Sequence, residues 1–380
     1  MYLTLREFLE NNLNSYPIKT IDINQAIKLQ HKLVDSITKE FDGLDILKTG
    51  DLGVNPLNNQ PIATRKVERV LAKFFDCEDA VFVRGSGTGA IREGLASIIS
   101  ANENLLVHTS EIYSTSKTTI DNAGYNLVCA DFNNVDEITN VISRNNIKAA
   151  LIQYSRQEIS DSYDIAEVID TIKKSNPSIK IITDDNYVVM KVDKIGCQLG
   201  ANISAFSVFK LLGPEGIGLV VGTKDEIAKI RDFHYSGGSQ VQGFEAMDAL
   251  RSIVLAPVQL AIQSQQIEIL SKELNSGAIE DIKEAVIANA QSKVLLVHFN
   301  EKIAKKVLEE STKLGAAAYP IGSESKYEIV PMFYRLSGTM RRSNIEFEDY
   351  WIRINPMKAS SETVLRILKE AIKKAKNVSK

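Results

Sequence analysis

The stretch that decides the fold is FSVFKLLGPEGIGLVVG, residues 206–222. An apolar run precedes Lys210, and a loop rich in small residues separates this lysine from the strand-like run IGLVV. This order predicts that the Lys210 amine lies at the edge of a sheet and not on a solvated helix face. A lysine there can form an imine, because burial beside Phe206 and Phe209 disfavours the ammonium form and lowers the pKa. Taken alone, Lys210 could equally be a surface lysine in a loop.

A second segment, IKIITDDNYVV at residues 179–189, is an apolar, β-branched run that ends in two aspartates. It is typical of a buried parallel strand whose C-terminal end delivers a carboxylate, and open α/β sheets bind ligands at that edge. Because side chains alternate across a strand, only one of Asp184 and Asp185 can point into a site. The structural alternative is that the two aspartates are turn or helix-cap residues.

A third segment, FVRGSGTGAIREGLASII at residues 82–99, passes from a short apolar run through a glycine-rich turn into a helical pattern. Glycines let backbone amides approach an anion closely, and the N-terminus of a helix adds a favourable dipole. The turn therefore predicts a phosphate site at Ser86, Gly87 and Thr88. It matches neither the dinucleotide glycine pattern nor a Walker A sequence, and a glycine-rich turn by itself is weak evidence.

The pattern Ser-x-x-Lys-x-x-Gly-Pro-x-x-x-Gly, which begins at Ser207, resembles the lysine loop of pyridoxal-phosphate (PLP) enzymes of fold type I, the aspartate-aminotransferase superfamily. The longer run is especially similar to the loop of bacterial selenocysteine synthases. The resemblance implies an α/β fold of the PLP-dependent transferase type, with a large domain on a mostly parallel seven-stranded sheet and a smaller C-terminal α/β domain. It also implies PLP as the cofactor, an internal aldimine on Lys210 and a phosphate contact from the Ser207 hydroxyl.

The strand-end aspartates resemble the Asp-Asn-x-Tyr or Asp-Asn-Thr pattern of methionine and cystathionine γ-lyase relatives. This match implies that Asp185 holds the protonated pyridine nitrogen of the cofactor, with Asn186 and Tyr187 following it. Asp184 is the alternative if the register differs by one residue. The separation between Asp185 and Lys210 suits one βαβ-like excursion between neighbouring elements of a site.

Two further strand ends resemble cofactor contacts of the same superfamily. In LLVHTSEIYSTSKTTI, residues 105–120, Tyr113 matches the tyrosine that stacks on the cofactor ring in the γ-lyase relatives. His108 is the alternative because class V aminotransferases use a histidine, and core packing would also explain an aromatic residue here. The strand end in LIQYSRQEI, residues 151–159, resembles the one at which these relatives place polar contacts to the oxygen of the cofactor ring. Gln153 is the candidate for this contact. The other polar residues of this strand end are Ser155 and Arg156, the latter also consistent with a surface salt bridge.

The C-terminal part supplies a candidate for binding the substrate carboxylate. Fold type I enzymes usually use an arginine of the small domain, because a planar guanidinium matches a carboxylate in bidentate fashion. The run WIRINPMKASSETVLRIL, residues 351–368, resembles the strand-then-helix ending that carries this arginine and implies Arg353. Arg335 competes because FYRLSGT resembles the Arg-Leu-Ser of γ-lyases. An exposed strand arginine is the structural alternative for both.

Composition limits the remaining classes of function. The 380 residues carry a formal net charge of −3, which offers no basic face for nucleic acid. No apolar run approaches membrane-spanning length, and the start MYLTLREFLENN lacks the order of a signal peptide, so we expect a cytoplasmic protein without a membrane partner. Cys77, Cys129 and Cys197 show no spacing typical of a disulfide framework or a zinc site, and we expect no metal.

The order of patterns predicts three parts: an N-terminal helical segment at 1–45, a large PLP-binding domain at 46–270 and a small domain at 271–380. Strands alternate with helical patterns to about residue 225, as in a parallel sheet covered on both faces. A long helix is expected from Glu245 to about Ala290. The small domain follows with the strand candidates VLLVHF, EIVPMFYRL and YWIRINPM and the closing helix SSETVLRILKEAIKKA.

These patterns together predict a PLP-dependent enzyme that acts on an amino acid and is aminotransferase-like. A carbon–sulfur or related lyase is the first alternative, and a non-catalytic binding scaffold is the second. A desulfurase is disfavoured because the loop before Arg353 lacks a cysteine nucleophile. We also expect a homodimer with shared active sites, because the loop 49–61 and the segment 236–243 resemble segments that fold type I dimers lend to the neighbouring site. Arg65 or Gln240 would then reach the partner's phosphate.

Overall fold

The computed structural model describes residues 15–56, 59–156, 158–290, 292–320, 324–338 and 346–377. These residues form two compact units. The larger unit comprises residues 23–155 and 162–258, and the smaller comprises residues 15–22, 156–161 and the described part of 259–380. The boundary lies between residues 258 and 259, inside the helix α9 (Gly243–Asn275), and the predicted boundary at residue 270 falls in the same helix. Continuous helical sequence marks no break at either position. The predicted N-terminal segment is divided between both units, and its first 14 residues lie outside the described ones.

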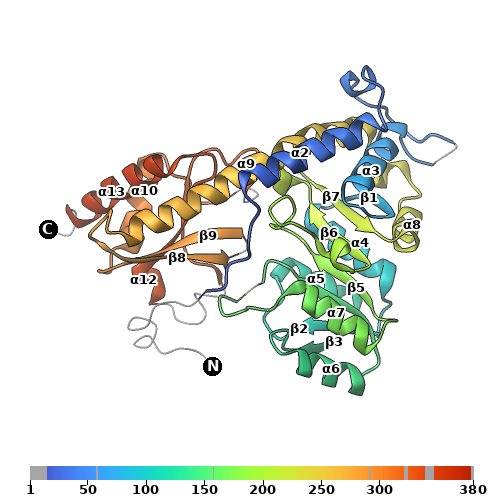
Figure 1. The fold of residues 1–380 in the computed structure, drawn as a ribbon, viewed down its shortest axis with the longest axis horizontal. Helices are drawn as coiled ribbons and strands as arrows, with labels where there is room; N and C mark the ends of the chain where they lie inside the picture. Colours follow the sequence, from blue (N-terminus) through green and yellow to red (C-terminus); the bar gives the residue numbers. More distant parts are fainter. Residues whose placement is uncertain are drawn as a thin grey trace. The chain divides into compact units, whose positions relative to one another are not determined.

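A seven-stranded sheet forms the centre of the larger unit (Figure 1). Its order is β1-β7-β6-β5-β4-β2-β3. Strand β7 runs antiparallel to both of its neighbours, and the other four pairings are parallel, so the predicted mostly parallel sheet is confirmed. The strands are β1 (Asp79–Arg84), β2 (Asn104–His108), β3 (Asn126–Ala130), β4 (Ile147–Gln153), β5 (Lys180–Asp184), β6 (Ile203–Ser207) and β7 (Ile217–Gly222).

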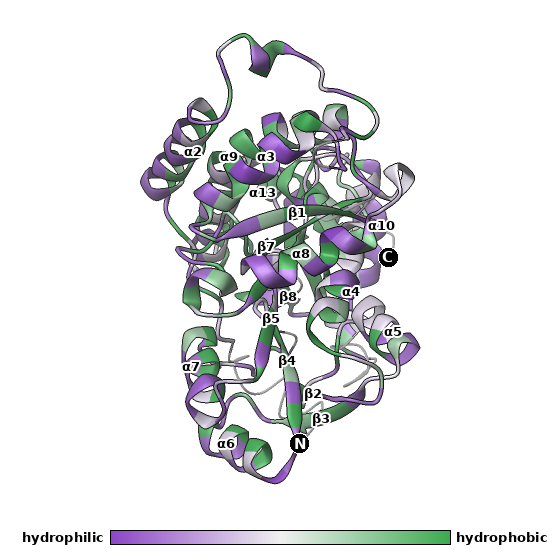
Figure 2. Cartoon of the chain, turned by 90° about the vertical axis from the view of Figure 1, so that its right-hand side faces the viewer, coloured by the Kyte–Doolittle hydropathy of each residue, from purple (hydrophilic) through white to green (hydrophobic). Residues whose placement is uncertain are grey.

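Helices cover both faces of this sheet. Along β5, Ile182 packs in the cluster that contains Leu95 of α4 (Ser86–Ile98), and Ile181 packs in the cluster that contains residues of α6 (Val135–Arg144) and α7 (Ile165–Ser175). Figure 2 shows hydrophobic and hydrophilic stretches along α6, as expected for a helix with one buried side. The other elements are α2 (Ile23–Thr38), α3 (Ile62–Phe74), α5 (Ser114–Ala123), α8 (Lys224–Phe233) and the short 3-10 turns η1 (Asp45–Leu47), η2 (Gly196–Leu199), η3 (Phe209–Leu211) and η4 (Gly237–Ser239). Among the described residues no helix has the length and apolar character needed to cross a membrane.

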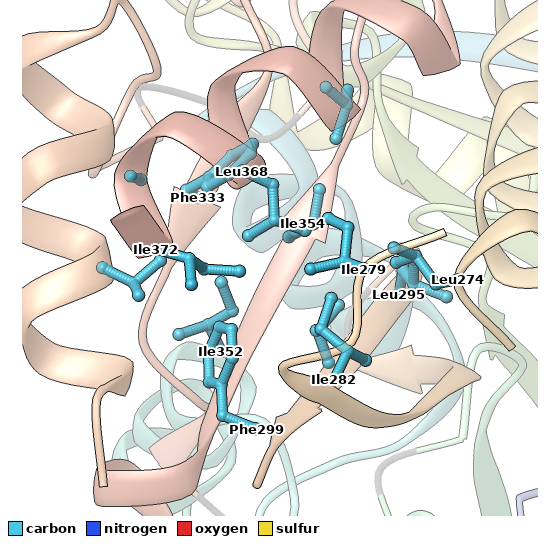
Figure 3. Packing of buried hydrophobic residues seen from close by; sticks show 14 of the residues in the cluster. Leu274, Ile279, Ile282, Leu295, Phe299, Phe333, Ile352, Ile354, Leu368 and Ile372 are labelled. Atoms are coloured by element: carbon cyan, nitrogen blue, oxygen red, sulfur yellow. The ribbon is translucent and has the colours of Figure 1, made fainter. Parts of the chain in front are cut away.

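The smaller unit contains a four-stranded antiparallel sheet in the order β10-β11-β9-β8. Side chains alternate along β11: Ile352 and Ile354 meet Leu368 and Ile372 of the closing helix (Figure 3), whereas Trp351 packs in a second cluster. The elements are β8 (Ile282–Ala290), β9 (Ser292–Phe299), β10 (Met332–Tyr334), β11 (Trp351–Asn355), α10 (Ala304–Lys313), α12 (Phe347–Tyr350) and α13 (Ser361–Asn377).

The helix expected from Glu245 to about Ala290 is shorter than predicted. Helix α9 ends at Asn275, and Gly277 has a φ of 88°, a left-handed conformation that suits a helix end. The following run IKEAVIANA forms β8 and pairs with β9. Its Lys, Glu and Ala residues favour a helix locally, and pairing with the neighbouring strand overrides that preference.

Candidate active site

Lys210 lies in η3, in the tight connection between β6 and β7. The amide of Gly213 donates to the carbonyl of Val208 over 3.1 Å, and a Cβ on Gly213 would lie 2.3 Å from Cγ1 of Val208. Only glycine therefore fits this turn. Lys210 is half-buried, and the turn holds it at the C-terminal end of β6, the sheet edge predicted from the sequence.

Asn186 connects Lys210 to the end of β5. Its Oδ1 accepts a hydrogen bond from Lys210 Nζ over 3.3 Å and one from the Ser207 amide over 3.0 Å. Its Nδ2 donates to Oδ1 of Asp184 over 2.7 Å. The Tyr187 ring adds a cation–π contact, with its centroid 3.7 Å from Lys210 Nζ. The sequence pattern contained Asn186 and Tyr187 but gave neither residue a function.

Asp184 lies on the same side of the sheet as Lys210. It follows Ile182 by two residues and so shares the face that packs against α4. Burial raises the pKa of the Asp184 carboxyl, while the charge of Lys210 and the hydrogen bonds from Asn186 oppose this rise. Gln153, the residue predicted to contact the ring oxygen of the cofactor, is the register partner of Asp184 on β4 and lies beside it.

Asp185, which the sequence match favoured, is fully buried, and its Oδ1 has no hydrogen-bond partner among the described residues. Its Oδ2 accepts hydrogen bonds from Thr183 Oγ1 over 3.1 Å and from the Gly196 amide over 3.0 Å. Burial raises its pKa to about 7, although hydrogen bonds from Ser204, Gly196 and Thr183 oppose the shift. Asp184 is thus the carboxylate that interacts with the charge of Lys210, and Asp185 is the one with a buried oxygen left for a further hydrogen-bond donor.

The glycine-rich turn lies next to the lysine loop. The hydroxyls of Ser86 and Ser207 are 2.6 Å apart, although the two residues belong to distant segments. A Cβ on Gly87 would lie 2.6 Å from Asn186 Oδ1, so a side chain at this position would displace the residue that holds Lys210. Thr88 Oγ1 donates to Thr115 Oγ1 over 3.2 Å. The first-turn amides of α4 have no partner within their helix, which is the usual arrangement of an anion site.

Tyr113 and His108 occupy different surroundings. Tyr113 precedes α5, and burial raises the pKa of its hydroxyl, with the charges of Lys210 and Asp184 also acting on it. His108 instead accepts a hydrogen bond at Nδ1 from the Phe132 amide over 2.9 Å, and its ring packs 5.2 Å from that of Phe132. Of these two residues Tyr113 is thus the one that interacts with the charge of Lys210, and His108 belongs to the packing of the sheet.

Ser155 and Arg156 lie where the chain passes between the two units. Ser155 is buried at the end of the larger unit's segment 23–155. Arg156 belongs to the smaller unit, where its Nη2 donates to the carbonyl of Tyr16 over 2.5 Å. This contact gives Arg156 a structural function within that unit.

The two candidate arginines for the substrate carboxylate are neighbours in the smaller unit. Arg353 is only 8% exposed, and its Nε donates to the Arg335 carbonyl over 2.8 Å. Its guanidinium carbon lies 4.1 Å from the centroid of the Tyr334 ring, and Tyr334 is its register partner on β10. Arg335 has an exposed side chain. Of the two guanidinium groups, the one on Arg353 is held more firmly.

Arg65 and Gln240, predicted to reach a partner's phosphate, make contacts inside the larger unit. Arg65 forms a bidentate pair with Asp79, with distances of 2.7 and 3.2 Å. Gln240 donates through Nε2 to the His234 carbonyl over 2.7 Å and is buried. Both side chains therefore stabilise the fold of their own chain.

These residues fit PLP. A primary amine lies at the sheet edge, a buried carboxyl with a raised pKa lies near it, and an aromatic side chain lies close to both. Two serine hydroxyls and the N-terminus of α4 offer donors for a phosphate. The chain therefore offers a partner for each part of PLP: the aldehyde, the protonated ring nitrogen, the ring face and the phosphate.

Comparisons with known proteins agree with this fit. The chain matches the family described as Aminotransferase class-V over residues 57–298 and the family described as YhfS-like, C-terminal domain over residues 268–368. It is 49% identical over 360 residues to YhfS, an uncharacterised protein of Escherichia coli strain K12, covering 95% of this chain and 99% of that protein. The crystal structure of the pyridoxal-5'-phosphate-dependent protein YhfS from Escherichia coli superimposes with a TM-score of 0.93 over the same shares of the two chains.

More distant structures share the fold. A cystathionine γ-lyase, CalE6, from Micromonospora echinospora has a TM-score of 0.71 at 14% identity, covering 91% of this chain and 99% of its own. A putative cystathionine β-lyase from Listeria innocua has a TM-score of 0.68 at 16% identity, covering 92% and 95%. The predicted fold type and the predicted cofactor are confirmed. The chain belongs to the aminotransferase class-V family and is a PLP-dependent enzyme of fold type I that resembles YhfS over almost its whole length.

Proposed function

We propose that this enzyme transforms an amino acid in an aminotransferase-like reaction, in which the Lys210 amine binds the cofactor and then moves the proton at the substrate α-carbon. When bound, PLP supplies an electron sink for the charge that develops on that carbon. The observation that carries the proposal is the hydrogen-bonded chain from Lys210 Nζ through Asn186 to Asp184. Asn186 keeps the amine beside Asp184, which precedes Asp185 in the chain, so the general base and the group proposed to hold the ring are positioned together.

We assign the cofactor's protonated ring nitrogen to Asp185, with Asp184 as the alternative. The buried Oδ1 of Asp185 has no partner among the described residues, whereas its Oδ2 is held by Thr183 and the Gly196 amide. A buried carboxyl with a raised pKa becomes ionised when a cation is placed beside it, because the opposite charge favours the carboxylate form. Asp185 would thereby keep the ring nitrogen protonated, and Asp184 would hold Asn186 and through it the Lys210 amine.

The remaining contacts follow from the geometry of the larger unit. Ser86, Gly87 and Thr88, at the N-terminus of α4, bind the phosphate together with the Ser207 hydroxyl. Tyr113 stacks on the ring, and a polar contact to the ring oxygen comes from Gln153, beside Asp184 in the sheet.

For the substrate carboxylate we favour Arg353 over Arg335. The Arg353 guanidinium is buried, stacked on Tyr334 and held through Nε, so little conformational entropy is lost when a carboxylate binds. The exposed side chain of Arg335 would lose more conformational entropy on binding a carboxylate.

A carbon–sulfur or related lyase is the second candidate, and Tyr113 is the observation in its favour. The γ-lyase relatives stack a tyrosine on the ring, and the charges of Lys210 and Asp184 act on the Tyr113 hydroxyl. Both reactions begin with the same proton abstraction by Lys210. The residues assigned to the cofactor therefore do not distinguish the aminotransferase reaction from the lyase reaction.

Titration with amino acids distinguishes the alternatives. The holoenzyme should show a visible absorption band that changes when one class of L- or D-amino acid is added. Aminotransferase activity yields an oxo acid and a stoichiometric amount of pyridoxamine phosphate, whereas a lyase releases ammonia and the original band returns. A band that responds to none of the common amino acids would leave the scaffold alternative and contradict the proposal.

We also propose a homodimer. The loop 49–61, of which residues 57 and 58 lie outside the described ones, is joined to the segment 236–243 by the hydrogen bond from the Gly53 amide to Gln242 Oε1, 2.8 Å long. Large apolar side chains in and next to these segments are exposed: Leu44, Leu47, Leu52, Tyr235 and Phe244. Exposed large apolar side chains gathered in two hydrogen-bonded segments support the proposal that these segments are covered by a second copy of the chain.

Sedimentation equilibrium measures this association. We expect a dimer at micromolar concentration, strengthened by the cofactor if residues of both subunits bind it. Leu52→Asp combined with Tyr235→Asp should yield monomers, whereas Lys39→Asp, on an exposed part of the same unit, should not. A monomer with and without PLP would contradict the proposal.

A further inference from the structure

Cys77 and Cys197 are neighbours in the larger unit although 120 positions separate them in sequence. Their Sγ atoms lie 2.6 Å apart, in van der Waals overlap, and both cysteines are partly buried. Cys77 follows α3 at the turn into β1, and Cys197 lies in η2. Nothing in the local sequence around either cysteine indicates this pairing.

We propose that Cys77 and Cys197 are a reversible dithiol–disulfide site that joins η2 to the turn between α3 and β1. Both partners are already held in place by other contacts. The Cys197 amide donates to Ser204 Oγ over 2.8 Å, and the Cys77 amide donates to the Ala72 carbonyl over 2.9 Å. The residues next to them are also joined, since Gln198 Nε2 donates to Asp76 Oδ2 over 3.3 Å. Closing the bond therefore requires little movement of the backbone.

The oxidation is a thiol–disulfide exchange with a low-molecular-weight disulfide such as glutathione disulfide. The Cys77 thiolate attacks one sulfur of the oxidant, forms a mixed disulfide and releases the first glutathione thiolate, which takes up the Cys77 proton. The Cys197 sulfur then attacks Sγ of Cys77 and displaces the second glutathione as a thiolate. This thiolate takes up the Cys197 proton. Two protein thiols are oxidised by two electrons, and one glutathione disulfide is reduced to two glutathione molecules.

The surroundings indicate which cysteine reacts first. The hydrogen bond with Cys77 and burial both raise the pKa of the Cys197 thiol, so its thiolate is scarce. Cys77, in the turn after α3, is then the attacking residue and Cys197 the resolving one. The third cysteine, Cys129, is exposed on β3 and would form only a mixed disulfide.

The bond would restrain a segment that supports the cofactor site. The Gly196 amide, next to Cys197, donates to Asp185, the neighbour of Asp184. A disulfide between residues so far apart in sequence also removes many conformations from the unfolded chain. Oxidation should therefore raise the thermal stability of the larger unit. This inference does not depend on the reaction that the enzyme catalyses.

The test uses the full-length holoenzyme with Cys129→Ser, treated with glutathione disulfide or with dithiothreitol. We expect a cross-linked Cys77–Cys197 peptide by mass spectrometry, loss of both free thiols, and a Tm at least about 4 °C higher in the oxidised form. Dithiothreitol should reverse all three changes.

Two variants provide the control. In the same background, Cys197→Ser should accumulate a glutathione adduct on Cys77, and Cys77→Ser should stay unmodified, with no rise in Tm for either. If Cys197→Ser fails to fold, Cys77→Ser still provides the comparison. A stable glutathione adduct on Cys77 without a cross-link in the parent protein, or thiols that resist the oxidant, would overturn the proposal.

Discussion

Replacing Lys210 by alanine should abolish the covalent adduct that borohydride traps between the protein and PLP. The amine of Lys210 is held at the sheet edge by Asn186 and lies over the Tyr187 ring, and alanine offers no nucleophile there. Turnover should fall by about a hundred- to ten-thousand-fold, the usual effect of losing a positioned acid–base group. Intact-mass analysis after reduction measures the adduct directly.

The matched control is Lys224→Ala. Lys224 is the next lysine along the chain and is exposed at the start of α8, so its removal should leave the adduct and the turnover unchanged. The Lys210 variant should still bind PLP without a covalent bond, because Ser86, Ser207 and the α4 amides are intact. A reduced Lys210→Ala protein that still carries the cofactor's mass would show that another amine is used.

Local patterns predicted the elements to which we assign the cofactor. The loop around Lys210 and the glycine-rich turn at Ser86 are short segments whose geometry depends on glycine and on the ends of neighbouring strands, so their sequences are sufficient. The mostly parallel sheet was predicted for a related reason, because alternating strand and helix patterns leave few other topologies.

Features that depend on contacts between distant segments were not predicted. The difference between Asp184 and Asp185 depends on the partners that each carboxylate meets on Asn186 and on the Gly196 amide, and a strand pattern does not encode those partners. In the same way β8 needs β9 to form, so its sequence alone suggested a helix. The proximity of Cys77 and Cys197 results from the placement of α3 and η2, which no spacing along the chain encodes.

Replacing Asp185 by asparagine should weaken PLP binding by about a hundredfold or more, since breaking a buried ion pair costs roughly 3–5 kcal/mol. Asparagine keeps the shape of the side chain but cannot neutralise a protonated ring nitrogen. The exchange of the substrate's α-proton with solvent deuterium should be suppressed as well, because the electron sink then lacks its positive charge. Cofactor titration and proton NMR of an amino acid in deuterated buffer measure the two effects.

Asp184→Asn is the matched variant one residue away, and it should have a much smaller effect on both measurements. Asparagine retains an oxygen that can accept the hydrogen bond from Asn186 Nδ2, so the contact that holds Lys210 is kept. The reverse outcome, a large loss for Asp184→Asn and little for Asp185→Asn, would move the ring nitrogen to Asp184. It would also mean that the buried Oδ1 of Asp185 gains no partner when PLP binds, since only Oδ2 is hydrogen-bonded among the described residues.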